Sequence, residues 1–421
     1  MSLTKNKIPE DNGGATTSRT LIIGKVQPFI SNNEKITLDL FQAYFDARKN
    51  KRNTINALMF EKHLEANVFE LFEEIVNYRY KPKPSICFIV DKPVKREIFA
   101  ADFRDRVVHH FIYNYIAPIF ETSFITDCYS CRKGKGTHYG IKRIDHFIRS
   151  CSQNYSQDCY ILKLDIKGYF MSINKTLLFE KIKIELKKKP QLINFDLKLV
   201  LYLIEQTIFN DPKENCKIKG KKSDWNDLPK TKSLFYAHTD CGLPIGNLTS
   251  QLFANIYLND FDYWIKRELQ IKYYGRYVDD FVLIHPDKYY LMNCISLIKR
   301  YLSEQSHLML HPDKIYFQHY SKGLKYLGTV IKPHRIYIAN QTKGNYFEAI
   351  ENHNKIARDH KPTNEEKAAF LCTMNSYLGI LKHYKTYKHR KSAVFKYLSA
   401  WWWNYVYLTG GIAKFVLKRK H

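Results

Sequence analysis

The stretch YYGRYVDDFVLIHPDK, residues 273–288, constrains the fold more than any other part of the sequence. Two adjacent carboxylates, Asp279 and Asp280, interrupt a run that is otherwise apolar and typical of a buried β-hairpin. Burying a carboxylate costs free energy unless the group is paired or binds a metal ion. Arg276 is the one cation beside them in the sequence, so a divalent metal is the natural counter-charge. The alternative is a pair of solvated acids in an exposed turn.

A third acid occupies a similar position upstream. Asp165 ends the apolar segment ILKLD, where a strand is expected, and a turn with the sequence IKGYF follows it. Mg²⁺ in phosphoryl-transfer sites takes one or two carboxylates together with substrate phosphates. Acids at two strand ends can hold two such ions about 3.5–4 Å apart. We therefore expect Asp165, Asp279 and Asp280 to bind two Mg²⁺ ions, for which Mn²⁺ is a substitute.

The composition indicates a polyanionic partner. The chain has 67 Lys and Arg against 41 Asp and Glu, a formal charge of +26, and 15% aromatic residues. Cations meet phosphates and aromatic rings stack on bases, so nucleic acid is expected, although a generally basic protein has the same charge. Cys128 and Cys131 form the one C-x-x-C pair, which we interpret as reduced thiols rather than a zinc site. No signal peptide and no apolar run of membrane-spanning length is visible, so a cytoplasmic protein without membrane contact is expected.

Hydrophobic periodicity and turn residues divide the chain into segments. We expect a flexible tail over 1–35 and a long polar loop over 209–240, which its length marks as functional. Strands are expected at 86–101, 159–165, 273–285, 325–331 and 335–338, and helices at 36–80, 105–121, 139–150, 175–208, 250–269 and 345–405.

At this point the residues resemble those of reverse transcriptases. Tyr277-Val278-Asp279-Asp280 is similar to their Y-x-D-D box, and Asp165 with the DIKGYF turn resembles the segment that carries their first catalytic aspartate. Further blocks follow in the family's order: 91–110, 131–141, 243–251, 308–317 and 325–331. The resemblance covers about residues 80–335. It implies an α+β right-hand polymerase fold, with fingers over 36–158, a palm over 159–335 into which 209–240 is inserted, and a helical, basic thumb over 336–421.

One block points to a subgroup. Most reverse transcriptases have Gln-Gly where this chain has Ile245-Gly246, and IGNLTSQ resembles the corresponding block of diversity-generating retroelement enzymes. That group copies a template-repeat RNA into cDNA from dNTPs, misreads adenines and works with a small basic accessory protein. The resemblance implies the same here, in a bacterial cytoplasm, on an RNA template and an RNA–DNA duplex. Ile245 lacks the donor and acceptor of Gln, so we expect looser discrimination at the nucleotide.

The remaining site residues each have a structural alternative. Phe170 is expected to block a 2′-hydroxyl, or else to be a core ring. The amides of Lys167, Gly168 and Tyr169 are expected to cradle a triphosphate.

Gly246 is expected to let the backbone approach the nucleotide, unless it is an ordinary turn glycine. Lys92 and Arg96 are expected to clamp the triphosphate, or else form a solvated basic turn. Lys314 is either a general acid for the pyrophosphate or a surface lysine. Basic residues of the C-terminal helices are expected to contact the duplex backbone: Lys382, His383, Lys385, Lys388, Arg390 and Lys391.

Three activities remain open at this level. The first is an RNA-templated DNA polymerase, which serves either diversification or antiphage defence. The second is a catalytically idle RNA-binding scaffold on the same fold, against which the complete set of acids argues. The third is an RNA-dependent RNA polymerase, which the bulk of Phe170 disfavours.

Overall fold

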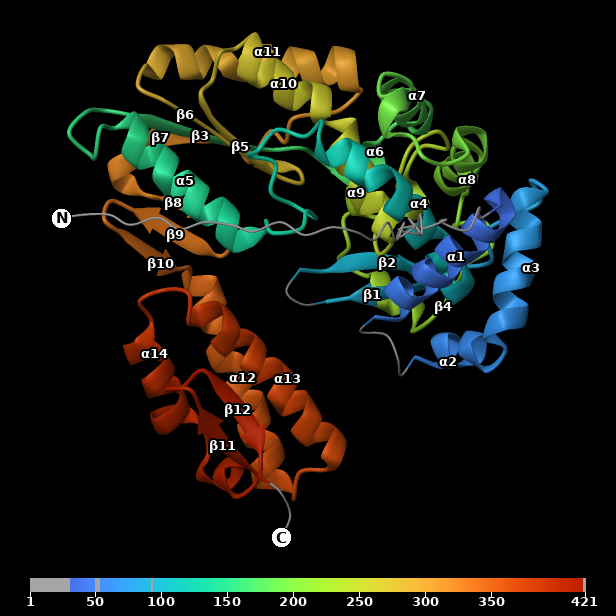
Figure 1. Cartoon of the computed structure of the whole chain (residues 1–421). Helices are drawn as coiled ribbons and strands as arrows, with labels where there is room; N and C mark the ends of the chain where they lie inside the picture. The colour runs from blue at the N-terminus through green and yellow to red at the C-terminus, as the bar shows by residue number, and fades with distance from the viewer. Residues whose placement is uncertain (1–30, 50–53, 92–93, 419–421) are drawn as a thin grey trace, which may run out of the picture.

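The computed structural model describes residues 31–49, 54–91 and 94–418, which form helices and four small sheets (Figure 1). The mixed helix-and-sheet class expected from the sequence is confirmed. In these residues no helix combines the length and the apolar character that a membrane crossing requires.

The N-terminal helices pack around a long central helix. α1 (Asn32–Arg48) lies against α4 (Phe103–Glu121), while α2 (Ile55–Lys62) and α3 (Leu64–Val76) complete the group. Ser31 caps α1: its hydroxyl accepts from the Glu34 amide, and the Glu34 carboxylate accepts from the Ser31 amide. α1 therefore starts inside the segment expected to be a tail, and residues 32–35 are helical. Residues 1–30 lie outside the described part.

A three-stranded sheet carries the expected basic hairpin. β1 (Ile86–Val90) pairs antiparallel with β2 (Arg96–Ala100), and β4 (Lys217–Ile218) joins the other edge of β1 in parallel. β4 belongs to 209–240, expected to be an unstructured loop. That segment also contains three short 3₁₀ helices, Lys222–Trp225, Lys230–Lys232 and Leu234–Tyr236.

The central sheet has the order β5-β6-β3-β7 and is antiparallel throughout. Its strands are β3 (Tyr160–Asp165), β5 (Tyr273–Tyr277), β6 (Asp280–His285) and β7 (Tyr316–His319). Period-two alternation sends the side chains of β3 to two different cores: Ile161 packs with α5 (Thr137–Cys151), whereas Leu162 and Leu164 pack in the large core. Figure 1 shows α5 along one side of the sheet and α10 (Asn259–Arg267) and α11 (Lys288–Ser306) along the other. The large core also includes α7 (Lys175–Lys187), α8 (Leu197–Phe209) and α9 (Leu248–Tyr257).

The last quarter of the described chain forms a further three-stranded sheet and a C-terminal unit. The sheet β10-β9-β8 consists of β8 (Leu324–Tyr326), β9 (Thr329–Lys332) and β10 (Arg335–Ile338). Beyond it, α12 (Asn340–Asp359), α13 (Asn364–Leu381) and α14 (Tyr387–Ser392) enclose their own core, in which Phe370 stacks on Trp402 at 4.1 Å between ring centroids.

The segment 336–421, expected to form a helical thumb, also contains strands, because a hairpin of β11 (Val406–Thr409) and β12 (Lys414–Leu417) closes the unit. The sequence TGGI between the two strands supplies Gly410 and Gly411, both at positive φ, for the tight turn.

Candidate active site

The three predicted acids lie at one end of the central sheet. Asp165 is the last residue of β3 and is directly opposite Asp280, the first residue of β6. Asp279 is in the turn between β5 and β6, and its carbonyl accepts a hydrogen bond from the Ile166 amide at 3.2 Å. The arrangement follows from the antiparallel pairing of β3 and β6. The end of β3 meets the start of β6, and each of these two positions is an acid.

The carboxyl of Asp279 lies in an unfavourable electrostatic environment. Burial, and next the negative charge of Asp165, raise the pKa of Asp279 to about 6. Lys314 and Arg96 act in the opposite direction. Asp165 and Asp279 are therefore close enough to repel each other, and additional positive charge would stabilise the ionised pair.

Asp280 has a different environment. Its Oδ2 is 3.0 Å from the Nζ of Lys163, while its Oδ1 is buried without a hydrogen-bond partner. Burial raises the pKa of Asp280 to about 6 although Lys163 opposes the shift. The sequence analysis found no cation beside the acids except Arg276, and the structure corrects this. Lys163 comes two residues before Asp165 on the same strand, so both side chains lie on the same face of the sheet. This spacing of two residues could have identified Lys163 from the sequence.

The acids do not form one compact metal-binding group. Across the described ranges, no set of three or more His, Cys, Asp or Glu side chains is arranged to hold a metal ion. Asp280 instead points to Lys163, and Asp165 pairs with Lys314, whose Nζ is 2.9 Å from Oδ1. Lys314 is thus brought to the acids, as the general-acid hypothesis requires, and its side chain is about half exposed.

The turn that carries Asp279 is held by buried residues outside it. Val278 has a φ of +59°, which is rare for a β-branched side chain. Its amide donates to Ser130 Oγ at 3.1 Å, and its carbonyl accepts from Arg276 Nη1 at 2.9 Å. Ser130 in turn donates to Asn255 Oδ1.

Arg276 is fully buried and does not pair with Asp165, Asp279 or Asp280. Its guanidinium forms two hydrogen bonds to Asp262, at 2.7 and 2.6 Å, and the hydroxyl of Tyr274 donates to the same carboxylate. This pair explains how a charged residue is tolerated in the middle of β5, and it was not expected from the sequence.

The turn after Asp165 is tightly packed. Gly168 has a φ of +57°, and a Cβ there would lie 2.6 Å from the carbonyl oxygen of Thr231, so only glycine fits. The Lys167 amide donates to the Met309 carbonyl at 2.8 Å. This contact corrects the expectation that all three turn amides face a triphosphate, and leaves those of Gly168 and Tyr169 as candidates. The side chain of Tyr169 is buried and donates to the Ala254 carbonyl.

Phe170 and Ile245 meet in a small apolar cluster. Both are half-buried and pack with Leu234, Phe99 and Met171. Phe170 therefore serves as a packed ring whatever else it does. Ile245 holds the strand β2, because its carbonyl accepts from the Phe99 amide at 2.9 Å.

Gly246 was expected to allow the backbone to approach a nucleotide. A Cβ there would instead lie 3.0 Å from a methyl of Ile98 and 3.1 Å from the Phe99 carbonyl. In the structure, the backbone of Gly246 therefore packs closely against β2.

The segment 216–237, here called the strap, is anchored on the basic hairpin by Glu97. This buried carboxylate accepts three hydrogen bonds: from the Trp225 indole at 2.7 Å, the Ser233 hydroxyl at 2.8 Å and the Leu234 amide at 2.6 Å. The strap thereby reaches both Gly168, through Thr231, and the cluster around Phe170. The sequence marked the segment as functional by its length, but not Glu97 as its anchor.

Arg96 is exposed at the start of β2, and its charge lowers the pKa of Asp279. It is therefore within electrostatic reach of the acids, as the clamp hypothesis requires. Lys92, the other predicted clamp residue, lies outside the described residues.

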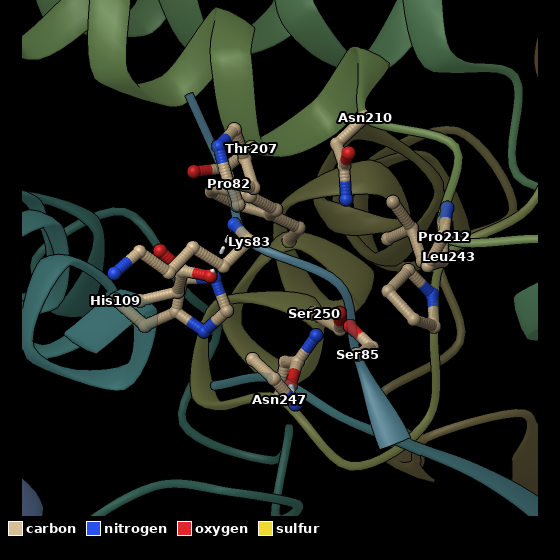
Figure 2. A pocket seen from close by; sticks show the side chains of 14 residues that line it. Pro82, Lys83, Ser85, His109, Thr207, Asn210, Pro212, Leu243, Asn247 and Ser250 are labelled. Atoms are coloured by element: carbon tan, nitrogen blue, oxygen red, sulfur yellow. Dashed lines mark hydrogen bonds between the residues drawn. The ribbon is translucent and has the colours of Figure 1, made fainter. Parts of the chain in front are cut away.

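A separate polar cavity lies behind the block that contains Ile245. Figure 2 shows Lys83, His109, Asn247 and Ser250 around it, and Asp105 also lines it. Its volume is about 20 Å³, enough for roughly one water molecule. None of the three acids lines this cavity, which therefore is not the centre of the chemistry.

Comparison with known proteins places this geometry in a family. Residues 82–331 match the family described as "Reverse transcriptase (RNA-dependent DNA polymerase)". Protein YkfC of Escherichia coli (strain K12) is 24% identical over 308 residues, which cover 65% of this chain and 73% of YkfC.

Two solved telomerase structures are also similar, each at 13% identity. The apo enzyme from Candida tropicalis has a TM-score of 0.43 and covers 63% of this chain, and the enzyme from Candida albicans with a telomeric RNA fragment has a TM-score of 0.39 and covers 82%. The chain spans 59% and 60% of the length of these two proteins. The reverse transcriptase match, in contrast, covers the hairpin, the central sheet and all three acids. Because it extends over more than half of the sequence, the chain belongs to the reverse transcriptase family.

Proposed function

We propose that the protein is an RNA-directed DNA polymerase that copies an RNA into cDNA from dNTPs. The observation that carries the proposal is the position of Asp165 and Asp279 at neighbouring strand ends, inside the segment that matches the family. Burial, and next the charge of Asp165, raise the pKa of Asp279, as expected of a carboxyl in a site built for a cationic ligand.

The residues present suit Mg²⁺. The donors are carboxylate oxygens, and the buried Oδ1 of Asp280 still lacks a partner. Asp165 and Asp279 would hold the ions, while Asp280, paired with Lys163, would add negative charge. When bound, Mg²⁺ supplies activation of the primer 3′-hydroxyl and neutralisation of the pyrophosphate charge.

The chain's own residues would perform the other tasks. Arg96 offers a forked donor to the triphosphate on the side of the hairpin, together with Lys92. Lys314 lies close enough to Asp165 to donate a proton to the leaving group. Phe170 would limit the space beneath the sugar, and the basic residues of α14 would contact the duplex backbone.

The test is primer extension on an RNA template with a DNA primer. Asp279→Asn and Asp165→Asn should each abolish dNTP incorporation, since removing a ligand removes several kcal/mol of transition-state stabilisation. Asp359→Asn, an exposed acid at the end of α12, is the matched control and should retain full activity. Normal extension by a folded Asp279→Asn protein would contradict the proposal. Replacing dNTP by NTP in the same assay distinguishes a DNA polymerase from an RNA polymerase. If the wild-type protein incorporates neither nucleotide, the protein is a scaffold.

We further propose that copying is error-prone at template adenines, as in diversity-generating retroelements, with a small basic accessory protein as partner. Ile245 supports this, because it lies in the cluster with Phe170 and offers no polar group to the nucleotide. cDNA from one adenine-containing template should show fewer adenine errors with Ile245→Gln than with wild type. Ile245→Leu, which keeps an apolar side chain of equal size, should leave the error rate high. Equal rates in all three proteins would place the source of errors elsewhere.

A defence role is the second candidate, since the same core could copy a non-coding RNA during phage infection. Sequencing the RNA that copurifies with the protein, together with its cDNA, separates the two roles. A template repeat with adenine substitutions in the cDNA indicates diversification, whereas faithful copies of a structured non-coding RNA indicate defence.

A further inference from the structure

We propose that a basic hollow at the far end of the central sheet binds an unpaired segment of RNA outside the catalytic centre. The hollow lies between α5, the turn from β9 to β10 and the segment after α13, and has a volume of about 410 Å³. A cavity of this size suits a nucleotide-sized group. The residues on which the argument depends are Arg149, Tyr155, His334, Arg335, Tyr384 and Lys385.

The charge of the hollow is strongly positive. Arg149, Arg335 and Lys385 carry permanent charges and are exposed, and His334 and His383 add two further basic groups. The single carboxylate, Asp145, is 3.8 Å from Arg149. Three cations against one acid favour an anion, and because three separate chain segments contribute them, a polyanion can contact more than one of them.

Two tyrosines give the hollow an aromatic wall. The ring of His334 meets the ring of Tyr155 edge-on at 4.5 Å between centroids. The hydroxyl of Tyr384 is 3.0 Å from Nδ1 of His138, which fixes that ring against α5. Rings held in this way are surfaces on which bases stack, and stacking is open only to bases that are not paired. The combination therefore favours single-stranded RNA over a duplex or an acidic peptide.

The hollow is separate from the catalytic acids. Tyr155 precedes the first residue of β3, whereas Asp165 is the last residue of that strand. A strand of this length spans about 17 Å at roughly 3.3 Å per residue, so a nucleotide bound to the acids cannot occupy the hollow.

The hollow also opens onto the most basic part of the chain. No Asp or Glu follows Glu366 in the sequence, while residues 382–418 contain Lys382, Lys385, Lys388, Arg390, Lys391, Lys396, Lys414 and Lys418. The exposed Phe395 stacks with Trp403 at 5.7 Å in the same unit. A strand leaving the hollow would thus meet further cations and rings.

The inference rests on the proposed function for one step only, the choice of RNA as the polymer. Its test is a binding measurement without dNTPs, so that failure of catalysis and failure of binding remain distinguishable. A fluorescent, unstructured oligoribonucleotide is titrated with the full chain while an excess of unlabelled RNA–DNA template–primer fills the catalytic cleft. Anisotropy reports the affinity at several salt concentrations.

Two pairs of variants locate the site. Arg149→Gln with Arg335→Gln removes two cations from the hollow. Lys299→Gln with Arg300→Gln removes two exposed cations from α11 on the other side of the sheet. We expect the first pair to weaken binding at least tenfold and to reduce the salt slope by about 1.4, roughly 0.7 for each lost phosphate contact. The second pair should change affinity less than twofold.

The aromatic contribution is tested at one ring. Tyr384→Leu should weaken binding by about 5-fold or more without changing the salt slope, because stacking on an aromatic ring contributes roughly 1–3 kcal/mol per base. Tyr384→Phe keeps the ring but loses the hydroxyl contact to His138, so it should bind more tightly than Tyr384→Leu and no more tightly than wild type. The proposal would be overturned if both pairs of charge variants lost affinity equally, or if Tyr384→Leu and Tyr384→Phe had the same affinity. It would also be overturned if the template–primer displaced the oligoribonucleotide. Tighter binding of double-stranded than single-stranded RNA would overturn it too.

Discussion

The hydroxyl of Ser130 accepts a hydrogen bond from the amide of Val278 at 3.1 Å, across nearly 150 residues of sequence. Val278 is held at a φ of +59° between Tyr277 and the catalytic candidate Asp279. Such a backbone conformation costs about 1–3 kcal/mol and persists only where neighbouring groups enforce it. Ser130 on one side and Arg276 on the other provide that enforcement. The position of Asp279 thus depends on residues that contact no substrate.

Ser130→Ala should reduce the extension rate about tenfold, which corresponds to about 1.4 kcal/mol, because the turn can then relax toward negative φ and displace Asp279. The same substitution should have a smaller effect in a Val278→Gly protein, since glycine adopts positive φ without strain. The measurement is the single-turnover rate of the four proteins that combine the two changes.

Val278→Ala is the matched background for that test. It loses the same methyl groups as Val278→Gly but retains a Cβ and hence the cost of positive φ. If Ser130→Ala slows the glycine and alanine backgrounds equally, the serine does not act by holding the strained turn.

Phe170→Ala should admit ribonucleotides, with NTP incorporation relative to dNTP rising about tenfold or more, because a smaller side chain leaves room for the 2′-hydroxyl. Phe170 also packs with Met171 and Leu234, so part of the effect could come from a shift of the strap. Leu234→Ala opens the same cluster away from the sugar and controls for this. A similar change in discrimination in both variants would return Phe170 to a packing role.

Trp225→Phe should loosen the strap. The change keeps an aromatic ring but removes the indole donor, leaving Glu97 with two of its three hydrogen bonds. Hydrogen bonds to charged groups contribute about 1.5–3 kcal/mol, so the midpoint of urea unfolding should fall measurably. Because the strap touches Gly168, the KM for dNTP should rise as well. Trp264→Phe, where the indole stacks on Tyr301 in the large core, is the control, and an unchanged KM in Trp225→Phe would show that the strap does not shape the nucleotide site.

Two buried groups beside the cavity of Figure 2 should oppose each other in the pH dependence of stability. Burial, and next the charges of His110 and Arg106, lower the pKa of His109 to about 3. Its contribution to stability is complete above its unfolded pKa, roughly 6.5, and is lost as the pH falls toward 3. Burial raises the pKa of Asp105 to about 6, against hydrogen bonds from Lys83 and Tyr80. Its contribution is complete below roughly 3.8 and is lost as the pH rises through 6.

Between about pH 4 and 6 the two effects cancel, so removing either group should reveal the other. Relative to wild type, His109→Gln should gain stability on acidification by about 1.4 kcal/mol per pH unit, and Asp105→Asn should lose a similar amount. Urea unfolding at pH 4.5, 5.0 and 5.5 measures both slopes. His146→Gln, an exposed histidine on α5, is the control. Parallel curves for wild type and His109→Gln would show that His109 binds a proton in the folded state.

Much of the architecture followed from local sequence patterns. Apolar runs that end at acids placed β3, β5 and β6 correctly, and with them Asp165 and the turn of Asp279 and Asp280. The α+β right-hand polymerase class, which the resemblance to reverse transcriptases implied, is confirmed by the mixed helices and sheets and by the family match. The catalytic roles of these acids stay predictions.

Pairing between distant segments could not be read in the same way. Lys163 reaches Asp280 only because β3 and β6 align in one particular register, and Glu97 receives the strap from more than 100 residues away. The hairpin of β11 and β12 begins within the tryptophan-rich stretch 401–408. This stretch is too short for hydrophobic periodicity to distinguish a helix from a strand. Contacts of this kind depend on how distant segments pack in the whole molecule. A short window of sequence carries no information about that packing.

Neighbouring side chains of β2 point to opposite faces, so the register of this strand determines which charged groups face the acids. Arg96 and Glu97 are neighbours in sequence, yet one is exposed within electrostatic reach of Asp279 and the other is buried under the strap. A slip of β2 by one position that put Glu97 in the place of Arg96 would put Ile98 in the place of Glu97, so the strap would lose the acceptor of its three hydrogen bonds. A single-residue shift of this kind would therefore replace a positive charge within electrostatic reach of Asp279 by a negative one and release the strap at the same time, which no single substitution on the hairpin does.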